Sequence, residues 1–326
     1  MGKPHVLITC YYLDPGDEID QYVQSAGIET VFSRWHGGRT EEEMIELLPG
    51  VDGVLAGSDP YTARVLEAAD RLKVIARAGV GYEKVDVKAA SARNIAVCNT
   101  AGANRHAVAE WAIALMLVCA RKGLANLSEI RNGGWSRHEG VDLAGKTLGI
   151  IGLGTIGKEV AKRMRAFEMR VLAYDVRQDQ QFADEHQVSY LSVEQLLRES
   201  DVVTIHTFLD ARTKHLINAE RLALMKPTAY LINTARGSIV DTEALYEALR
   251  DKRIAAAALD VFEEEPLSPD SPLRHLDNLY TSPHVGGSSR EARDLASRTA
   301  ADDLLRVLRG ERPLYPVNPQ VFNEQP

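Results

Sequence analysis

The chain has 326 residues, more than a single hydrophobic core usually serves, so two domains are expected. Hydrophobic residues make up 45% and charged residues 26%, which is typical of a soluble globular protein and excludes a largely disordered chain. The net charge of −8 at pH 7 repels phosphate backbones, so we expect no nucleic-acid partner.

The first part of the chain alternates short apolar runs with amphipathic segments, the pattern of βα units in a parallel sheet. The apolar runs predict strands at residues 6–9, 53–56, 73–76 and 95–98. The segments between them have helical spacing and predict helices at residues 18–26, 40–48, 62–69 and 85–93. An α/β fold follows from this alternation.

A second series of the same kind follows a long helix predicted at residues 104–122. Its strands are predicted at residues 147–151, 170–174, 202–206, 229–233, 255–259 and 279–281. Its helices are predicted at residues 156–166, 193–198, 218–224 and 242–250, and a last long helix at residues 288–308. The proline-rich segment 312–319 predicts an extended tail.

The two series predict two α/β domains, one inserted into the other. If the second series is a single doubly wound domain, the last long helix crosses back to the first series. We therefore expect a discontinuous domain of residues 1–101 plus 290–326, with residues 102–289 forming the inserted domain.

A glycine-rich segment predicts a dinucleotide site. Gly152, Gly154 and Gly157 follow a strand and open a helix, where they permit a tight turn, close approach of a pyrophosphate and close packing of helix on strand. Asp175 ends the next strand, where a carboxylate binds the ribose hydroxyls and repels a 2′-phosphate. The cofactor predicted is NAD; Arg177 is the one nearby residue that could instead receive a phosphate.

Three polar segments follow late strands of the second series, where ligands of open α/β sheets bind. His284 titrates in the range that a general acid or base needs for alcohol oxidation. Glu265 could hold its ring and raise its basicity, and Arg236 could bind a carboxylate bidentately. The individual alternatives are a turn cap for His284, a solvated charge run for Glu265 and a helix-end contact for Arg236.

Four motifs together, GLGTIG, NTARGSIVD, ALDVFEEEP and SPHVGGS, resemble the D-isomer-specific 2-hydroxyacid dehydrogenases, with RAGVG and NTAGAN earlier in the chain. The resemblance implies a Rossmann-type NAD-binding domain inserted into a flavodoxin-like substrate domain. It implies Arg236 as substrate anchor, Glu265 as the partner of His284, and His284 as acid/base. It also implies that Asp260 holds the nicotinamide carboxamide. The further cofactor contacts implied are Thr155, Ile156, Thr207, Thr234, Ala235 and Gly287.

The resemblance also bears on the substrate. Arg77, Val80, Gly81 and Asn104 match substrate-side positions, and Val80 and Gly81 would offer backbone amides to the substrate carboxylate. Within the family the chain is most similar to D-3-phosphoglycerate dehydrogenases.

Three departures from the family pattern stand out. Glu265 stands where formate dehydrogenases have glutamine, and Phe208 replaces a usual proline. Gly57 replaces an arginine common in phosphoglycerate dehydrogenases, although Arg77 and Arg137 could supply cations in its place. Both 3-phosphoglycerate and an unphosphorylated acid, such as glyoxylate, hydroxypyruvate or D-lactate, therefore remain open as substrates.

The remaining expectations concern partners and location. A homodimer is expected from the resemblance and from an apolar stripe on the first long helix, formed by Ala107, Trp111, Ala114, Leu115 and Val118. The alternative for this stripe is the core between the two domains. The three cysteines are far apart and odd in number, so we expect reduced thiols in a cytoplasm and no metal site. No secretory segment or membrane span is expected. The alternative of another class is a binding protein similar to an NADH-sensing corepressor.

Overall fold

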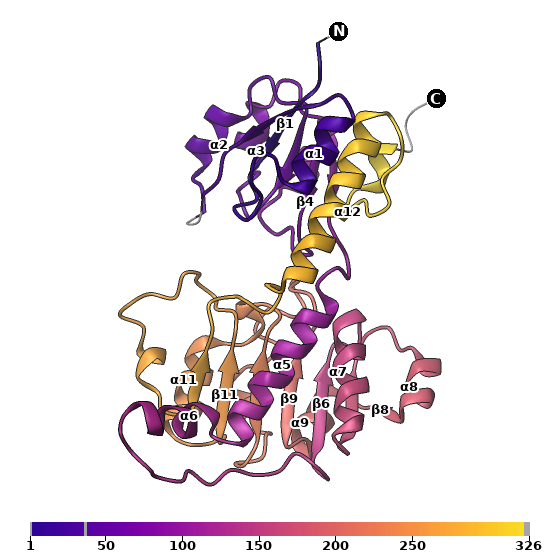
Figure 1. Cartoon of the computed structure of the whole chain (residues 1–326). Coiled ribbons are helices and arrows are strands. Elements are labelled where there is room, and N and C mark those ends of the chain that lie inside the picture. Colours follow the sequence, from indigo (N-terminus) through magenta and orange to yellow (C-terminus); the bar gives the residue numbers. More distant parts are fainter. Residues whose placement is uncertain (1, 36–37, 323–326) are drawn as a thin grey trace. The chain divides into compact units, whose positions relative to one another are not determined.

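The computed structural model of the chain describes residues 2–35 and 38–322, and Figure 1 shows their arrangement into helices and strands. The chain divides into two compact units. Unit 1 comprises the chain up to Asn104 and again from Ser289, and unit 2 is Arg105–Ser288. The sequence predicts domain boundaries after residues 101 and 289. Residues 1, 36–37 and 323–326 of the predicted first domain lie outside the described residues.

Unit 1 contains a five-stranded sheet in the order β2-β1-β3-β4-β5, with every pair parallel. The strands are β1 (His5–Ile8), β2 (Glu29–Phe32), β3 (Gly53–Ala56), β4 (Val74–Arg77) and β5 (Ala96–Cys98). The helices are α1 (Glu18–Ser25), α2 (Glu41–Leu47), α3 (Ala63–Glu67), α4 (Val87–Ala92) and α12 (Arg290–Leu308). This strand order is that of flavodoxin-like folds, and the α/β prediction is confirmed.

The sheet of unit 1 is covered on both faces. Val6 and Ile8 belong to one buried cluster and Leu7 to another, because successive side chains of a strand point to opposite faces. Helices α1 and α12 pack on the first face, and α2, α3 and α4 on the second. Strand β2 was not predicted, because this edge strand alternates exposed and half-buried residues instead of forming a continuous apolar run.

The C-terminal segment of unit 1 is paired with the sheet, which an extended tail alone does not imply. Pro316 forms an antiparallel bridge with Cys98, and the Val317 amide donates to the Val97 carbonyl at 2.7 Å. The buried side chain of Asn318 accepts from the Val97 amide at 2.7 Å. A short 3-10 helix, η3 (Pro319–Phe322), follows. The segment therefore satisfies backbone groups at the edge strand β5.

Unit 2 contains a seven-stranded parallel sheet in the order β12-β11-β10-β9-β6-β7-β8, the Rossmann order with one strand added. Its strands are β6 (Thr147–Ile151), β7 (Arg170–Tyr174), β8 (Val188–Tyr190), β9 (Val202–Ile205), β10 (Tyr230–Asn233), β11 (Ala256–Leu259) and β12 (Leu279–Thr281). Its helices are α5 (Arg105–Ala120), α6 (Gly123–Arg131), α7 (Thr155–Ala166), α8 (Gln180–His186), α9 (Val193–Glu199), α10 (Ala219–Leu222) and α11 (Thr242–Arg250). The predicted Rossmann-type domain is confirmed.

Two buried clusters lie on the two faces of this sheet. Ile151 and Leu172 belong to the cluster under α9, α10 and α11, and Ile150 and Val171 to the cluster under α5, α7 and α8. Strands β9 and β11 are buried throughout, and apart from Thr204 of β9 their residues are apolar. The unpredicted β8 is a three-residue edge strand with Ser189 exposed, and α8 was also missed.

The predicted helix over residues 104–122 extends two residues beyond the end of α5. Helix α5 ends at Ala120, Lys122 adopts φ 47°, and a second helix, α6, begins at Gly123. A Cβ on Gly123 would lie 3.2 Å from the Val118 Cα, so glycine permits this close turn. Of the predicted dimer stripe, Leu115 is buried in the core of unit 2, and the other four residues are partly buried.

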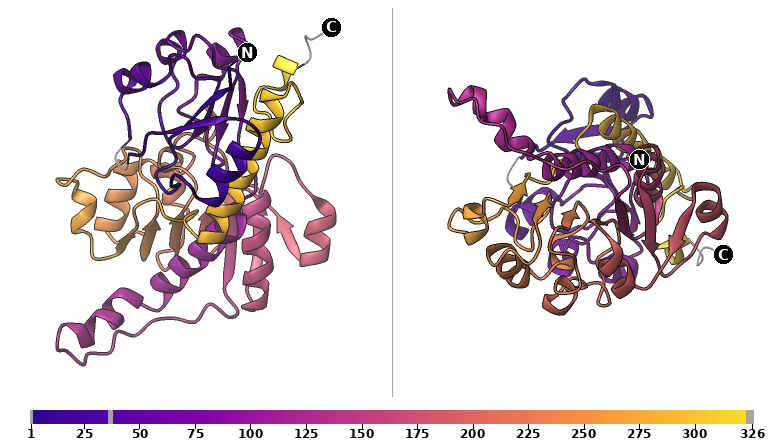
Figure 2. Two further views of the ribbon diagram at one scale, coloured as in Figure 1. Left: turned by 45° about the horizontal axis from the view of Figure 1, so that its top comes forward. Right: turned by 90° about the horizontal axis from the view of Figure 1, so that it is seen from below.

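Helix α6 has no buried residue, and it projects away from the sheet of unit 2, with the loop that follows it (Figure 2). Within the described residues, none of the helices combines the length and apolar character that a membrane span requires.

Candidate active site

The glycine-rich loop between β6 and α7 is shaped by two glycines that no other residue could replace without movement. Gly152 has φ +97°, and a Cβ there would lie 2.7 Å from the Thr207 amide nitrogen. A Cβ on Gly157 would lie 2.2 Å from the Gly152 carbonyl oxygen. The loop therefore packs tightly against the end of β9 and against its own helix.

Gly154 is different, because a Cβ there would meet nothing within 4 Å. Gly154 is the N-cap of α7 and offers no side chain to the first amides of that helix. Open space beside free amides at the positive end of a helix suits a pyrophosphate, so the loop fits a bound dinucleotide. Thr155 and Ile156 form the first turn of α7, beside this space.

Asp175 follows β7 and lies against the same loop. One of its carboxylate oxygens accepts from the Leu153 amide at 2.7 Å, and the other from the Arg177 amide at 2.9 Å. Each oxygen keeps a second lone pair for a ribose hydroxyl. The Arg177 side chain is exposed.

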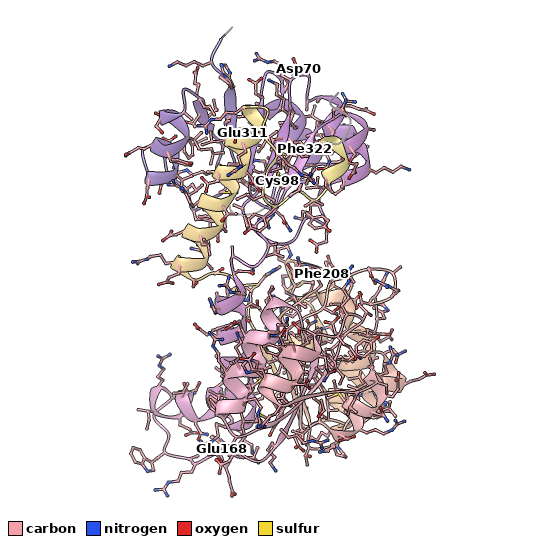
Figure 3. All side chains as sticks on the ribbon, turned by 90° about the vertical axis from the view of Figure 1, so that its right-hand side faces the viewer. Asp70, Cys98, Glu168, Phe208, Glu311 and Phe322 are labelled. Carbon is pink, nitrogen blue, oxygen red and sulfur yellow. The ribbon has the colours of Figure 1, made fainter. Side chains whose placement is uncertain are left out.

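The other predicted cofactor residues follow strands at the same end of the sheet. Thr207 follows β9 and precedes Phe208, whose side chain is exposed. Figure 3 shows Phe208 at the end of unit 2 where the strands finish, opposite to Glu168, which lies before the start of β7. Thr234 and Ala235 follow β10, and the buried Thr234 hydroxyl has no hydrogen-bond partner. Gly287 follows β12.

Asp260 is a buried carboxylate that organises the loop after β12. It accepts from the Ser282 hydroxyl at 2.6 Å, the Val285 amide at 2.9 Å and the Gly286 amide at 2.8 Å. The Trp111 indole of α5 donates to Ser282 in turn, at 3.1 Å. These hydrogen bonds offset the cost of burying the charge and hold the loop that carries His284.

Sequence reasoning missed the positions of Trp111 and Ser282 in this network. Ser282 stands two residues before His284 within a polar segment, which was a usable signal. Trp111 is separated from Ser282 by 171 residues, and nothing in the sequence around it indicated this contact.

The structure brings Glu265 and His284 together. Nδ1 of His284 lies 2.8 Å from Oε2 of Glu265, and Oε1 of Glu265 accepts from the Phe262 amide at 3.0 Å. Burial raises the pKa of Glu265, but the hydrogen bonds from His284 and Phe262 and the nearby positive charges lower it by more, so the pKa lies below its usual value. A glutamate held ionised in this way fixes the histidine ring and leaves Nε2 for a reactant.

The backbone of His284 has φ 53°, uncommon for a residue other than glycine. The His284 amide donates to the Asp260 carbonyl at 2.8 Å, so Asp260 holds this conformation from its backbone as well as its side chain. Such conformations concentrate at functional sites. The His284 side chain is about half exposed, at 51%.

Arg236 follows β10 at the start of a tight turn. Its Nη1 donates to the Ala235 carbonyl at 2.7 Å, and its own carbonyl accepts from Asn233 at 2.9 Å. The positive charge of Arg236 is among the causes that lower the pKa of Glu265. In unit 2 the structure therefore places Arg236, Glu265 and His284 after β10, β11 and β12 at one end of the sheet.

The predicted substrate residues belong to unit 1. Arg77 ends β4, and its guanidinium donates to the Ala78 carbonyl at 2.8 Å and to the Ser58 hydroxyl at 3.4 Å. The Val80 carbonyl accepts from Asn99 at 2.8 Å, in the loop that continues to Gly81. Asn104 has a buried side-chain oxygen without a partner.

No group of three or more potential metal ligands among His, Cys, Asp and Glu occurs in the described part of the chain. The fold and the site of unit 2 together define a dinucleotide-binding oxidoreductase with a histidine–glutamate pair beyond the carboxyl ends of a Rossmann sheet.

Comparison with known proteins specifies the family. The model of the D-isomer specific 2-hydroxyacid dehydrogenase NAD-binding domain matches residues 113–286. A glyoxylate reductase of Thermofilum pendens is 39% identical, over 100% of this chain and 98% of its own. A D-3-phosphoglycerate dehydrogenase of Archaeoglobus fulgidus is 41% identical over 90% of this chain and 56% of its own. The crystal structure of the TT0316 protein of Thermus thermophilus matches with a TM-score of 0.89 and 38% identity, over 96% of this chain and 99% of that one.

The chain belongs to the D-isomer specific 2-hydroxyacid dehydrogenase family. It is an NAD-dependent oxidoreductase, and the predictions of enzyme class and of NAD as cofactor are confirmed.

Proposed function

We propose that the protein transfers a hydride between NAD(H) and a small D-2-hydroxy acid/2-oxo acid pair, with His284 as the acid/base. The observation that carries this proposal is the 2.8 Å hydrogen bond between Nδ1 of His284 and the ionised Glu265. In the oxidation direction, Nε2 of His284 accepts the hydroxyl proton; in the reduction direction, the same atom returns it to the carbonyl oxygen.

The other residues orient the reactants. Arg236 binds the substrate carboxylate and polarises the adjacent carbonyl, for which a planar guanidinium is suited. Asp260 holds the loop of His284 in place and is also assigned to the nicotinamide carboxamide. NAD, when bound, takes or supplies the hydride. The glycine-rich loop and Asp175, with Thr155, Ile156, Thr207, Thr234, Ala235 and Gly287, are assigned to holding the cofactor.

For the substrate we propose an unphosphorylated 2-oxo acid such as glyoxylate or hydroxypyruvate, and 3-phosphohydroxypyruvate is the competing candidate. Val80, Gly81 and Asn104 are assigned to the substrate side with Arg77. Position 57 is a glycine, and a Cβ there would stand only 3.0 Å from the Thr9 carbonyl oxygen. Arg77 already donates to Ala78 and Ser58, so fewer of its donors remain for a phosphate. The full-length alignment with a glyoxylate reductase also supports this choice.

The proposal is tested by measuring kcat/KM for glyoxylate, hydroxypyruvate and 3-phosphohydroxypyruvate with NADH and with NADPH. We expect hydroxypyruvate to match or exceed its phosphorylated form. We expect the Kd of NADPH to exceed that of NADH by at least about tenfold, because a 2′-phosphate against Asp175 costs about a kcal/mol or more.

Three outcomes would change the proposal. A large preference for 3-phosphohydroxypyruvate that Arg77→Met abolishes, while the exposed control Arg93→Met keeps it, would assign a phosphate to Arg77. Equal binding of the two cofactors would contradict the role of Asp175. NADH binding without turnover on any 2-oxo acid would overturn the dehydrogenase activity.

We further propose that the chain forms a homodimer through α6 and the loop after it. Five large apolar side chains are exposed on this one segment, Leu124, Leu127, Ile130, Trp135 and Val141. A second copy is the occupant we propose, because exposed apolar side chains gathered on one projecting segment are costly in water, and pairing with the same segment of a second copy would bury them on both copies.

Light scattering should give a mass about twice the 35.9 kDa of one chain. Leu127→Arg should shift the mass to that of a single chain, whereas the control Leu314→Arg, at an exposed leucine of unit 1, should not. A single-chain mass for the unaltered protein would contradict the dimer.

The proposed location is the cytoplasm. The three cysteines, Cys10, Cys98 and Cys119, are buried free thiols, the state that a reducing compartment maintains. Burial raises the pKa of Cys10 and of Cys119 to about 12, so both remain protonated and unreactive.

A further inference from the structure

Glu263 is the first residue of the run Glu263-Glu264-Glu265, and its side chain makes two hydrogen bonds, whereas that of Glu264 makes none. Its Oε1 accepts from the Thr242 amide at the start of α11, at 2.9 Å. Its Oε2 lies 3.0 Å from Nε2 of His215. Glu264 is exposed and has no hydrogen bond or ion pair. A run that the sequence suggests is uniformly solvated thus contains a second hydrogen-bonded residue, Glu263, besides Glu265.

The two partners of Glu263 lie next to the turn that follows Arg236: Thr242 begins the helix after it, and His215 is hydrogen-bonded to it. His215 donates its backbone amide to the Ser238 carbonyl at 2.8 Å, within the turn η1 (Gly237–Ile239). Its φ of 50° is uncommon for a residue other than glycine. His215 therefore connects the segment after β11 to the segment after β10.

Gly237 brings the two backbones into direct contact. A Cβ on Gly237 would lie 1.9 Å from the Phe262 carbonyl carbon and 2.3 Å from the Glu263 nitrogen. The Phe262 amide in turn donates to Glu265 at 3.0 Å. A displacement of Phe262–Glu263 would consequently move the Glu265 carboxylate and, through it, the ring of His284.

We propose that Glu263 is a positioning residue that holds the segment of Glu265 against the turn of Arg236. It acts through its hydrogen bonds to Thr242 and His215. This inference rests on the proposed function, because it assumes that Arg236, Glu265 and His284 act together on the substrate. Glu263 itself touches no reactant.

The charges around Glu263 fit this role. Burial raises its pKa, but the hydrogen bonds from Thr242 and His215 and the charge of His215 lower it by more, so the carboxylate is ionised at neutral pH. A charged acceptor makes stronger hydrogen bonds than a neutral one, which favours a fixed position over a mobile one.

The test compares Glu263→Ala with the neighbouring control Glu264→Ala in the full chain, with turnover expressed per NADH-binding site. Such normalisation removes the effect of any unfolded fraction. We expect Glu263→Ala to lower kcat/KM for the 2-oxo acid by about tenfold, since misplacement of about 1 Å can cost up to about a hundredfold. The Kd of NADH should change by less than about twofold, because the glycine-rich loop belongs to β6 and α7.

Two further variants keep the inference testable if Glu263→Ala does not fold. Glu263→Gln keeps an acceptor for Thr242 and should recover part of the loss. His215→Asn, which tolerates a positive φ, should reproduce much of it. The two substitutions combined should cost less than the product of their separate effects, because they remove the same contact.

The outcomes separate this inference from the function on which it rests. If His284→Ala is inactive while Glu263→Ala equals Glu264→Ala per NADH site, the positioning role is wrong and the proposed function stands. A loss of protein yield without a loss of turnover per site also overturns it, since that is a purely structural effect. If His284→Ala retains turnover, both proposals fall together.

Discussion

Replacing His284 with alanine is expected to lower kcat for 2-oxo acid reduction by about a thousandfold, within the range of about 10² to 10⁴ for a general acid or base. The imidazole is the group that Glu265 holds at 2.8 Å, and its Nε2 is free of that contact. Alanine removes the proton donor while leaving the glycine-rich loop untouched. The Kd of NADH should therefore remain within about twofold of its original value.

Single-turnover measurements of NADH oxidation check this prediction, because they separate the chemical step from product release. His275→Ala is the matched control: His275 is exposed and makes no side-chain hydrogen bond or ion pair. A turnover of His284→Ala within tenfold of the original would assign the proton transfer to another group. The kcat of Glu265→Gln should lie between those of His284→Ala and of the control His275→Ala, since glutamine can hold the ring without the charge that supports a protonated imidazole.

The second large effect expected is on acid stability, through His206 at the end of β9. Burial lowers the pKa of His206 to about 3. Its Nε2 lies 2.9 Å from the Thr204 hydroxyl, and its Nδ1 is buried without a partner. Above the unfolded-state pKa of about 6.5, His206 is neutral in both states and has no effect on the pH dependence. Below it, the unfolded chain binds a proton that the folded unit does not.

Folding stability should consequently fall as the pH drops from about 6.5 toward 3. Between pH 7 and pH 4, the loss attributable to His206 is about 3 kcal/mol, from about 1.36 kcal/mol for each pH unit below 6.5. His206→Gln should remove that share of the loss, whatever its effect at pH 7.

Denaturant-dependent hydrogen exchange of β6 and β9 peptides at pH 7 and pH 4, corrected for intrinsic rates, reports the opening free energy of unit 2. The control His275→Gln should behave as the original chain. If His206→Gln loses as much stability as the original between the two pH values, His206 is not the group responsible.

Much of the site could be predicted because it follows strands. Buried parallel strands are mostly apolar, so β6, β7, β9, β10, β11 and β12 could be recognised without their neighbours in the sheet. Parallel strands bring their carboxyl ends to one edge, which is why Arg236, Glu265 and His284 could be expected near one another. The roles of Gly152 and Gly157 could be predicted from the spacing of the glycine motif, and the structure shows that a Cβ at either position would collide with backbone.

Other elements could not be read in this way. Strands β2 and β8 are short edge strands with exposed residues, so their formation depends on backbone pairing with β1 and β7. The break between α5 and α6 depends on a positive φ at Lys122, which no local pattern marks.

From the sequence, the two series of α/β elements and the glycine-rich loop followed from local periodicity and glycine stereochemistry, and Glu265 and His284 could be proposed as a pair because each follows a strand. The contacts between polar groups that lie far apart in the chain became visible only in the folded structure. Trp111 and Ser282 lie 171 residues apart, and His215 and Glu263 lie 48 residues apart. Such contacts depend on how the loops after different strands pack against one another. The sequence therefore does not distinguish Glu263 from its acidic neighbours, because its partner His215 comes close only in the folded chain.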